Sequence, residues 1–303
     1  MTESNKKKSS YVKALVLPGG GSRGAYQVGA SKAIIDSGVK FNYVFGTSIG
    51  ALNATMIAQN SLDRLEELWT KVRSSDIFLL PSAAQIGNVI FGHKLGLLDT
   101  SPLENLLWKE VDLPKLKESY TKAGWCTTDM CSLETKLFTI DDVLSKAHLV
   151  SILMATAAIP IAFPPQQING EGLWVDGGIV KNTPLDQAIK IGADEIFMVL
   201  LNPEVINECP TNIFRMMGRC FDVVLDASAR REIDSAHLYN RLLDSGSKES
   251  IGRKRVKLHI FQPRNPVNTS LLEIDPQRSK ELIKAGYDDT IDHLSKIDLN
   301  LIE

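Results

Sequence analysis

One serine in this sequence stands in the setting that a nucleophile needs. Ser48 is the central residue of Gly46-Thr47-Ser48-Ile49-Gly50, which follows an apolar strand-like segment and precedes a helix-like segment. In that context the G-x-S-x-G pattern predicts a sharp strand-to-helix turn that exposes the serine hydroxyl. Gly46 and Gly50 leave room for neighbouring elements, and the helix N-terminus favours a developing negative charge at the serine. The pattern therefore indicates acyl transfer at Ser48.

A glycine-rich turn precedes this serine in the chain. Its residues are Gly19, Gly20, Gly21, Ser22, Arg23 and Gly24. Three of the glycines fit G-x-G-x-x-G, the dinucleotide-binding pattern. A dinucleotide site needs an acid about 20 residues further on, at the end of the second strand. That strand ends here at Ser48, and Asp36 comes too early. The turn is therefore better interpreted as a source of backbone N–H groups for an oxyanion.

A serine hydroxyl needs a base to remove its proton. The histidines occur in no recognisable motif, so none is favoured as that base; they are His93, His148, His237, His259 and His293. Asp176 follows a short apolar segment and precedes Gly177 and Gly178, which allow the chain to turn away beneath it. From the residues alone, Asp176 is either this base or an ordinary turn-forming aspartate.

Taken together, these three motifs resemble those of the patatin-like phospholipase family. The family has a G-G-G-x-R/K-G turn, a G-x-S-x-G elbow and a later D-G-G/A, and this chain has all three in that order. Further stretches similar to bacterial members are Gly96–Leu107, Ala155–Pro165 and Lys181–Ile189. Pro18 departs from many members, which have Asp or another small residue there. The resemblance covers residues 13–203 well and the remainder less specifically.

The resemblance implies a Ser–Asp dyad that works without histidine, metal or cofactor. Ser48 would be the nucleophile and Asp176 the proton acceptor, with backbone N–H groups around Gly20, Gly21 and Ser22 holding the oxyanion. By analogy with other serine elbows, Ile49 could contribute a further N–H group. The implied activity is hydrolysis of phospholipid or lysophospholipid esters through an acyl-enzyme. For Arg23 we favour orienting the turn through backbone carbonyls over contacting a lipid phosphate.

The order of strand-like and helix-like segments predicts an α/β fold. The resemblance implies the three-layer α/β/α patatin-like form, with a mostly parallel central sheet and helices on both faces. The predicted strands are 13–17, 43–45, 124–128, 136–139, 173–175, 195–201 and 256–262. The predicted helices are 25–37, 49–60, 62–72, 102–107, 142–157, 183–191, 213–243 and 276–297. We expect residues 1–10 to form a disordered tail and 11–303 a single catalytic domain, with its core at 13–203 and a helical part at 204–303.

The sequence supports more specific predictions for three segments. The apolar run 149–170 contains prolines, so it predicts a buried helix ending near Ile159 and then a turn rather than a membrane span. The helical spacing of Met216, Cys220, Val223, Val224 and Ala227 predicts a stripe packed on the core, with a partner-binding face as the alternative. The segment 75–98 is either an irregular packed loop or a mobile apolar flap.

Composition narrows the functional classes. The formal net charge of −2 gives no general attraction to nucleic acid. The four cysteines form no C-x-x-C pair, so we expect reduced thiols and no zinc. The N-terminus lacks the apolar region of a secretory signal, which favours a cytoplasmic protein, and three lysines there are a weak basis for peripheral membrane contact. The sequence leaves the oligomeric state open.

Two other functions stay open as alternatives. One is a nucleotide-binding oxidoreductase that uses the glycine turn, and the other is a regulatory protein that keeps the fold without turnover.

Overall fold

The computed structural model describes residues 11–82, 87, 91–92, 94–202, 209–211, 213–246, 254–267 and 270–297, and all statements below concern these residues. The strands are β1 (Lys13–Leu17), β2 (Tyr43–Thr47), β3 (Lys122–Asp129), β4 (Thr135–Thr139), β5 (Gln166–Ile168), β6 (Glu171–Asp176), β7 (Glu195–Val199) and β8 (Lys257–Phe261). The α-helices of the described residues are α1 (Gly24–Asp36), α2 (Ile49–Ala58), α3 (Leu62–Trp69), α5 (Ser101–Glu110), α6 (Leu113–Glu118), α7 (Lys146–Ala157), α8 (Leu185–Lys190), α9 (Ile213–Asp244) and α10 (Pro276–Leu294).

All eight strands form one sheet, in the order β5-β6-β3-β2-β1-β7-β8, with β4 also paired to β3. The pairs from β3 through β2, β1 and β7 to β8 are parallel, whereas β4, β5 and β6 join antiparallel at one edge. The expected mostly parallel α/β sheet is therefore confirmed.

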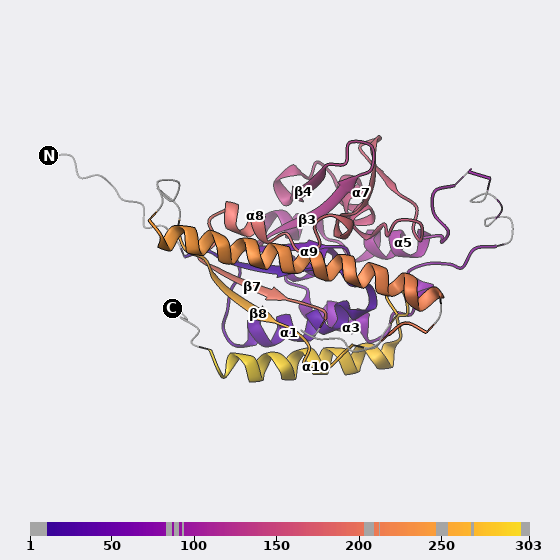
Figure 1. Cartoon of the computed structure of the whole chain (residues 1–303). Helices are drawn as coiled ribbons and strands as arrows, with labels where there is room; N and C mark the ends of the chain where they lie inside the picture. Colours follow the sequence, from indigo (N-terminus) through magenta and orange to yellow (C-terminus); the bar gives the residue numbers. More distant parts are fainter. Residues whose placement is uncertain are drawn as a thin grey trace.

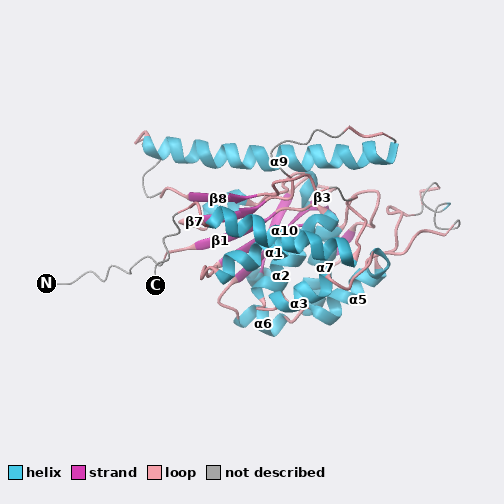
Figure 2. Cartoon of the chain, turned by 90° about the horizontal axis from the view of Figure 1, so that it is seen from below, coloured by secondary structure: helices cyan, strands magenta, loops and turns pink. Residues whose placement is uncertain are grey.

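Side chains alternate between the two faces of β1, and each set packs against different helices. Leu15 and Leu17 belong to a core with α1, α3 and α10. Ala14 and Val16 belong to another core with α8 and part of α9. Figures 1 and 2 show the resulting three layers, with α9 on one side of the sheet and α1, α3 and α10 on the other. A third apolar cluster joins β3 to α2, α5 and α7.

Most predicted elements are present, with boundaries shifted by a few residues. The expected helix at 142–157 begins later, at Lys146, because the Ser145 hydroxyl caps it by accepting the N–H of His148. That helix ends at Ala157 and a turn follows, as the prolines of the run 149–170 predict. The short elements β5 and α6 were not predicted. In the part of the chain that the structure describes, no helix combines the length and apolarity needed to cross a bilayer.

The expectation that the α9 stripe packs on the core is wrong. Met216, Val223 and Val224 are 49%, 58% and 41% exposed. Cys220 and Ala227 are exposed as well. The opposite face of the helix, which includes Ala229 and Ala236, is the buried one.

The segment 75–98 is described only in part, because residues 83–86, 88–90 and 93 lie outside the described residues. Isolated β-bridges hold its two ends, one between Leu79 and Asp99 and the other between Gly96 and Ile161. Leu80 and Leu95 are nonetheless exposed. The choice between a packed loop and a flap remains a prediction.

Candidate active site

Ser48 forms the sharp turn between β2 and α2. Its backbone has φ 55° and ψ −130°, a conformation that residues other than glycine rarely adopt. The hydroxyl oxygen of Thr156 accepts the N–H of Ser48 at 2.9 Å, and the same hydroxyl donates to the carbonyl of Cys126 at 2.6 Å. A serine at this turn projects into the space above the sheet, as a nucleophile elbow requires.

The flanking glycines make this turn sterically feasible. A Cβ on Gly46 would lie 2.3 Å from the carbonyl oxygen of Gly50, and a Cβ on Gly50 would lie 2.1 Å from that of Leu17. Neither obstacle is a flexible side chain, so a larger residue at either position would displace the backbone of the elbow.

The glycine turn lies directly against Ser48. A Cβ on Gly19 would come within 2.7 Å of the Ser48 Cβ atom. Gly21 has φ 57° and begins a short 3₁₀ turn that leads into α1. The turn therefore reaches Ser48 only because glycine occupies these positions.

The backbone N–H groups of the turn have different partners. That of Gly19 donates to Asn182 Oδ1 at 2.8 Å, and that of Ser22 donates to the carbonyl of Leu271 at 2.9 Å. Within the described chain, the N–H groups of Gly20, Gly21 and Ile49 have no acceptor. The Ser22 N–H is therefore already bonded in this conformation, contrary to the expectation that it faces the oxyanion, whereas the oxyanion role of the other three N–H groups stays a prediction.

Asp176 stands at the end of β6, beside the Ser48 elbow. Its carboxylate is buried, and Oδ1 accepts the N–H of Gly178 at 2.8 Å. Burial raises the pKa of Asp176 to about 6, while hydrogen bonds from the Ser48 side chain and the Gly178 N–H act in the opposite direction. Gly177 packs closely against the backbone of β3, since a Cβ there would lie 2.6 Å from the carbonyl oxygen of Cys126.

Arg23 is buried behind the glycine turn. Its Nε donates to the carbonyl of Gly20 at 3.2 Å, which matches the orienting contact that we favoured. The remaining guanidinium nitrogens contact Asn202 Oδ1 at 2.6 Å and Asp222 Oδ1 at 2.5 Å. With these partners, the Arg23 side chain links the glycine turn to Asn202 and to Asp222 on α9.

Sequence reasoning gave no role to Asn182 or Thr156. Asn182 accepts from the Gly19 N–H and its Nδ2 donates to the Gly19 carbonyl at 3.3 Å, so one amide binds both backbone polar groups of Gly19. It lies in the stretch Lys181–Ile189, whose similarity to bacterial members was the one available signal. Leu271 carried no signal in the sequence.

The cavity at Ser48 and Asp176 is narrow, with a volume of about 20 Å³. That volume is sufficient for roughly one water molecule. Apart from the motif residues, its walls are apolar and consist of Ile159, Pro160, Ile179, Phe221, Leu225 and Leu271. None of the described histidines lines it; His259, for example, is paired with Glu195 at 2.7 Å.

Comparison with known families agrees with this geometry. The family model for patatin-like phospholipase matches residues 15–189, which span β1 through α8 and include the glycine turn, Ser48 and Asp176. The chain belongs to the patatin-like phospholipase family. The nucleotide-binding alternative has no support, since the strand after the glycine turn ends at Thr47, directly before Ser48, and carries no acid at that end.

Individual relatives of this family member are distant. Lysophospholipase NTE1 of Yarrowia lipolytica is 25% identical over 190 residues, which are 61% of this chain and 12% of that protein. Patatin-like phospholipase domain-containing protein 7 of Rattus norvegicus is 27% identical over 187 residues, or 61% of this chain and 13% of that protein. The chain thus spans about an eighth of the length of these two relatives.

A viral relative is closer in size. Probable lipid hydrolase 463L of Invertebrate iridescent virus 6 is 26% identical over 193 residues, which cover 60% of this chain and 65% of that protein. Among solved structures, VipD from Legionella pneumophila matches 94% of this chain and 67% of its own, with 15% identity and a TM-score of 0.48.

Proposed function

We propose that this family member hydrolyses acyl esters of phospholipids or lysophospholipids with a Ser48–Asp176 dyad. The observation that carries the proposal is the pairing of a serine on a strained elbow with a buried carboxylate whose pKa is raised to about 6. Family membership supports the lipid substrate.

In the acylation step, Ser48 Oγ bonds to the ester carbonyl carbon while its proton passes to Asp176. The N–H groups of Gly20, Gly21 and Ile49 supply donors for the resulting oxyanion. When the intermediate collapses, the ester C–O bond breaks and the leaving alcohol takes the proton from Asp176. Water then attacks the acyl carbonyl carbon while Asp176 accepts its proton. The bond between Ser48 Oγ and the acyl carbon breaks, the proton passes from Asp176 to Ser48 Oγ, and the fatty acid leaves.

The raised pKa suits Asp176 to this role. An ordinary carboxylate is too weak a base to assist an alcohol efficiently, and a base works best when its pKa approaches the working pH. Burial in an apolar pocket moves Asp176 in that direction without a histidine.

Apolar side chains near the catalytic cavity support contact with a lipid aggregate. Val180 follows the Asp-Gly-Gly turn, and Ile161 follows the wall residue Pro160; they are 49% and 64% exposed. On α9, Val223 and Val224 are exposed between the cavity-lining Phe221 and Leu225. We propose a peripheral protein that meets its substrate at a membrane or micelle surface.

The test compares wild type, Ser48→Ala and the control Ser235→Ala on lysophosphatidylcholine micelles. Ser235 lies on α9 with its hydroxyl donating to the Arg231 carbonyl, outside the catalytic cavity. We expect Ser48→Ala to lower kcat at least about a thousandfold and to abolish labelling by a fluorophosphonate, since a nucleophile is lost. Undiminished hydrolysis by folded Ser48→Ala would refute the proposal.

A further inference from the structure

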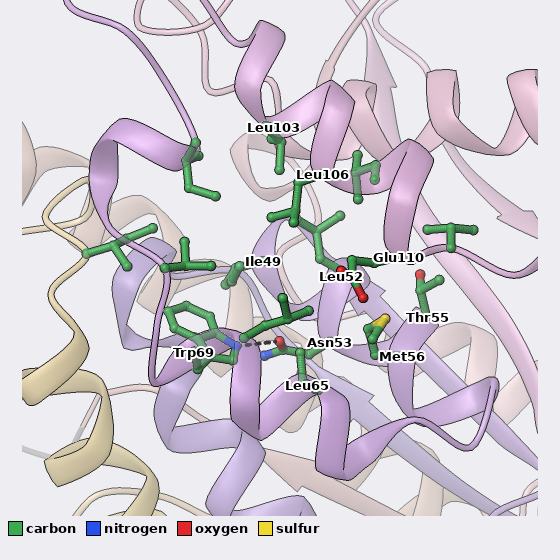
Figure 3. Close-up of a pocket in the computed structure, with 16 residues that line it drawn as sticks. Ile49, Leu52, Asn53, Thr55, Met56, Leu65, Trp69, Leu103, Leu106 and Glu110 are labelled. Atoms are coloured by element: carbon green, nitrogen blue, oxygen red, sulfur yellow. Dashed lines mark hydrogen bonds between the residues drawn. The ribbon is translucent and has the colours of Figure 1, made fainter.

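A second cavity lies between α2, α3 and α5, separate from the catalytic one (Figure 3). Its volume is about 90 Å³, several times the roughly 10–15 Å³ that one water needs. Most of its walls are apolar, with Leu52, Met56, Leu65, Leu103, Leu106 and the aromatic Trp69 among them. Several wall residues are half-buried, among them Leu68 on α3 and Leu106 on α5, and we take the space beside these two as an entrance to the cavity.

The few polar groups in the wall are already bonded within the protein. Asn53 donates from Nδ2 to the Gly24 carbonyl and accepts at Oδ1 from the Trp69 indole N–H. The Thr55 hydroxyl donates to the Ala51 carbonyl and accepts from the Trp125 indole N–H. The wall therefore offers no free hydrogen-bonding group, which disfavours both ordered water and a polar ligand.

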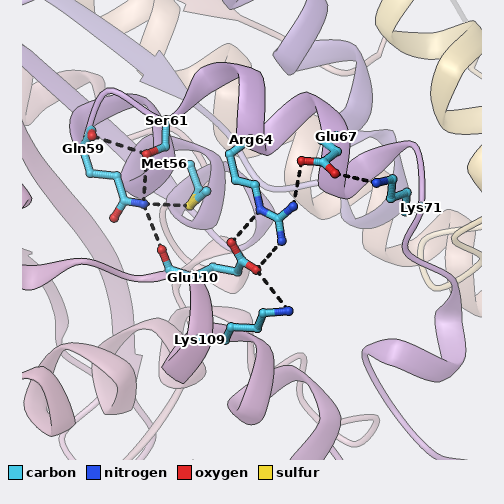
Figure 4. A network of polar contacts seen from close by, with 8 residues as sticks. All are labelled: Met56, Gln59, Ser61, Arg64, Glu67, Lys71, Lys109 and Glu110. Carbon is cyan, nitrogen blue, oxygen red and sulfur yellow. Dashed lines mark hydrogen bonds and ion pairs between the residues drawn. The ribbon is translucent and has the colours of Figure 1, made fainter.

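The remaining polar wall residue, Glu110, belongs to an ionic network at the edge of the cavity (Figure 4). Arg64 on α3 donates to both oxygens of the Glu110 carboxylate on α5, at 2.9 and 2.7 Å, and also to Glu67 at 2.7 Å. Lys71 pairs with Glu67 at 2.5 Å, and Lys109 lies 4.0 Å from Glu110. The network joins α3 to α5 beside an apolar interior, with three cations and two carboxylates.

We infer that this cavity binds the alkyl chain of a fatty acid or fatty acyl group, whose polar end stays at the charged rim. The apolar walls disfavour a polar occupant. Glu110 is the one charged residue among the walls, and Arg64 neutralises its carboxylate at the edge of the cavity, so the polar end of the chain stays outside the apolar interior. That the occupant is a lipid chain and not another apolar molecule rests on the proposed function.

The cavity also contacts the helix that carries the nucleophile elbow. Ile49, Leu52, Asn53, Thr55 and Met56 all belong to α2, and Ile49 directly follows Ser48. On another side, the segment around residues 271–274 borders both cavities, with Leu271 at the catalytic one and Ile274 at the alkyl-chain one. A chain bound here therefore touches the elements that position Ser48.

Trp69 makes binding measurable without any catalytic readout. Bromine quenches tryptophan fluorescence on contact, so 11-bromoundecanoic acid is titrated into the full chain below its micelle concentration, with undecanoic acid as the unbrominated control. We expect saturable quenching that is largely lost in Trp69→Phe. We also expect Leu106→Phe to weaken binding by roughly tenfold or more, because it fills the entrance.

The matched control is Leu144→Phe, since Leu144 is exposed and does not line the cavity. This variant should bind as wild type does. If Leu106→Phe fails to fold, Leu68→Phe fills the same entrance from α3. Either of two results would overturn the inference. One is quenching in Trp69→Phe of the same size as in wild type. The other is an unchanged affinity for the brominated acid in a folded Leu106→Phe or Leu68→Phe variant.

Two further arms distinguish the source of the chain. A free fatty acid should still quench Trp69 in Ser48→Ala and in enzyme blocked with a fluorophosphonate. If the occupant is the acyl chain of the substrate, Leu106→Phe should lower kcat/KM for long-chain p-nitrophenyl esters and leave the acetate ester unaffected. Because quenching needs no turnover, failure of the alkyl-chain site and failure of the proposed hydrolysis give different results.

Discussion

Ser48 has a backbone conformation that costs roughly 1–3 kcal/mol, and its surroundings hold it there. Thr156 binds its N–H, and Gly46 and Gly50 pack too closely to admit any larger side chain. The strain is thus maintained by contacts with β2, α2 and α7. We infer that it serves to present the hydroxyl to Asp176 and the glycine turn.

The pH dependence of hydrolysis should report the ionisation of Asp176. Only the carboxylate can accept the proton of Ser48, so kcat/KM should fall about tenfold per pH unit below a midpoint near 6. The measurement is a pH profile of kcat/KM with a soluble ester. A midpoint near the ordinary aspartate value of about 3.9 would contradict this role.

The same raised pKa has a consequence for stability. A buried carboxylate is disfavoured in its charged form, so the stability that Asp176 contributes is complete below its unfolded pKa and is lost as the pH rises through about 6. Asp176→Asn should therefore be inactive yet more stable at pH 8, by up to about 3 kcal/mol. The gain should shrink in melts recorded at pH 5; a variant less stable at both pH values would contradict the sign.

Sequence alone predicted the residues whose chemistry is encoded in local motifs. Ser48, Asp176 and the glycines each stand in a short pattern with its own backbone requirement. Asn182 and Leu271 act through contacts with residues far away in the chain, at Gly19 and Ser22. A single sequence does not indicate such pairs, because nothing local in either partner requires the other.

At the level of elements, the sequence predicted the helix α9 and its apolar stripe correctly. It assigned that stripe to the buried face of the helix, whereas the stripe is exposed. Periodicity identifies a helix face but does not say what covers it. The face with Val223 and Val224 is exposed, while Phe221 and Leu225 cover the catalytic cavity. β5 and α6 were missed for a simpler reason, since three and six residues are too few for a period to appear.

Phe221 should limit the size of the substrate that reaches Ser48. The cavity has a volume of only about 20 Å³, and Phe221 on α9 forms part of its wall. Phe221→Ala should raise kcat/KM for a long-chain ester by roughly tenfold relative to wild type, with little change for an acetate ester. Val223→Ala, on the exposed face of the same helix, is the control with a soluble ester. An equal change for both esters would argue against a steric role.

At the scale of the whole molecule, the residues beyond the family match complete the fold. The match ends at residue 189, yet β7 and β8 extend the sheet beyond β1, and α10 covers α1. The two helices meet through backbone contacts at Gly29 and Gly286. These contacts support our proposal that residues 11–303 form a single domain.

Gly29→Ala should disrupt this helix pair. A Cβ on Gly29 would lie 1.8 Å from the carbonyl oxygen of Ile283, so the helices would have to separate, at a cost of about 3 kcal/mol or more. Thermal or denaturant unfolding measures this loss.

The matched control for that variant is another helical glycine. A Cβ on Gly218, in α9, would meet nothing within 4 Å. Gly218→Ala should be neutral or stabilise the protein by up to about 1 kcal/mol, because alanine favours the helix. Equal stability of the two variants would show that α1 and α10 do not depend on this close approach.

The contact between Ser22 and Leu271 also bears on the order in which the protein is made. Leu271 and the α10 helix are synthesised after the glycine turn, Ser48 and Asp176. A growing chain therefore contains Ser48 and Asp176 before it has the carbonyl that accepts the Ser22 N–H and the helix that covers α1. The glycine turn and α1 reach the geometry described above only after α10 has left the ribosome.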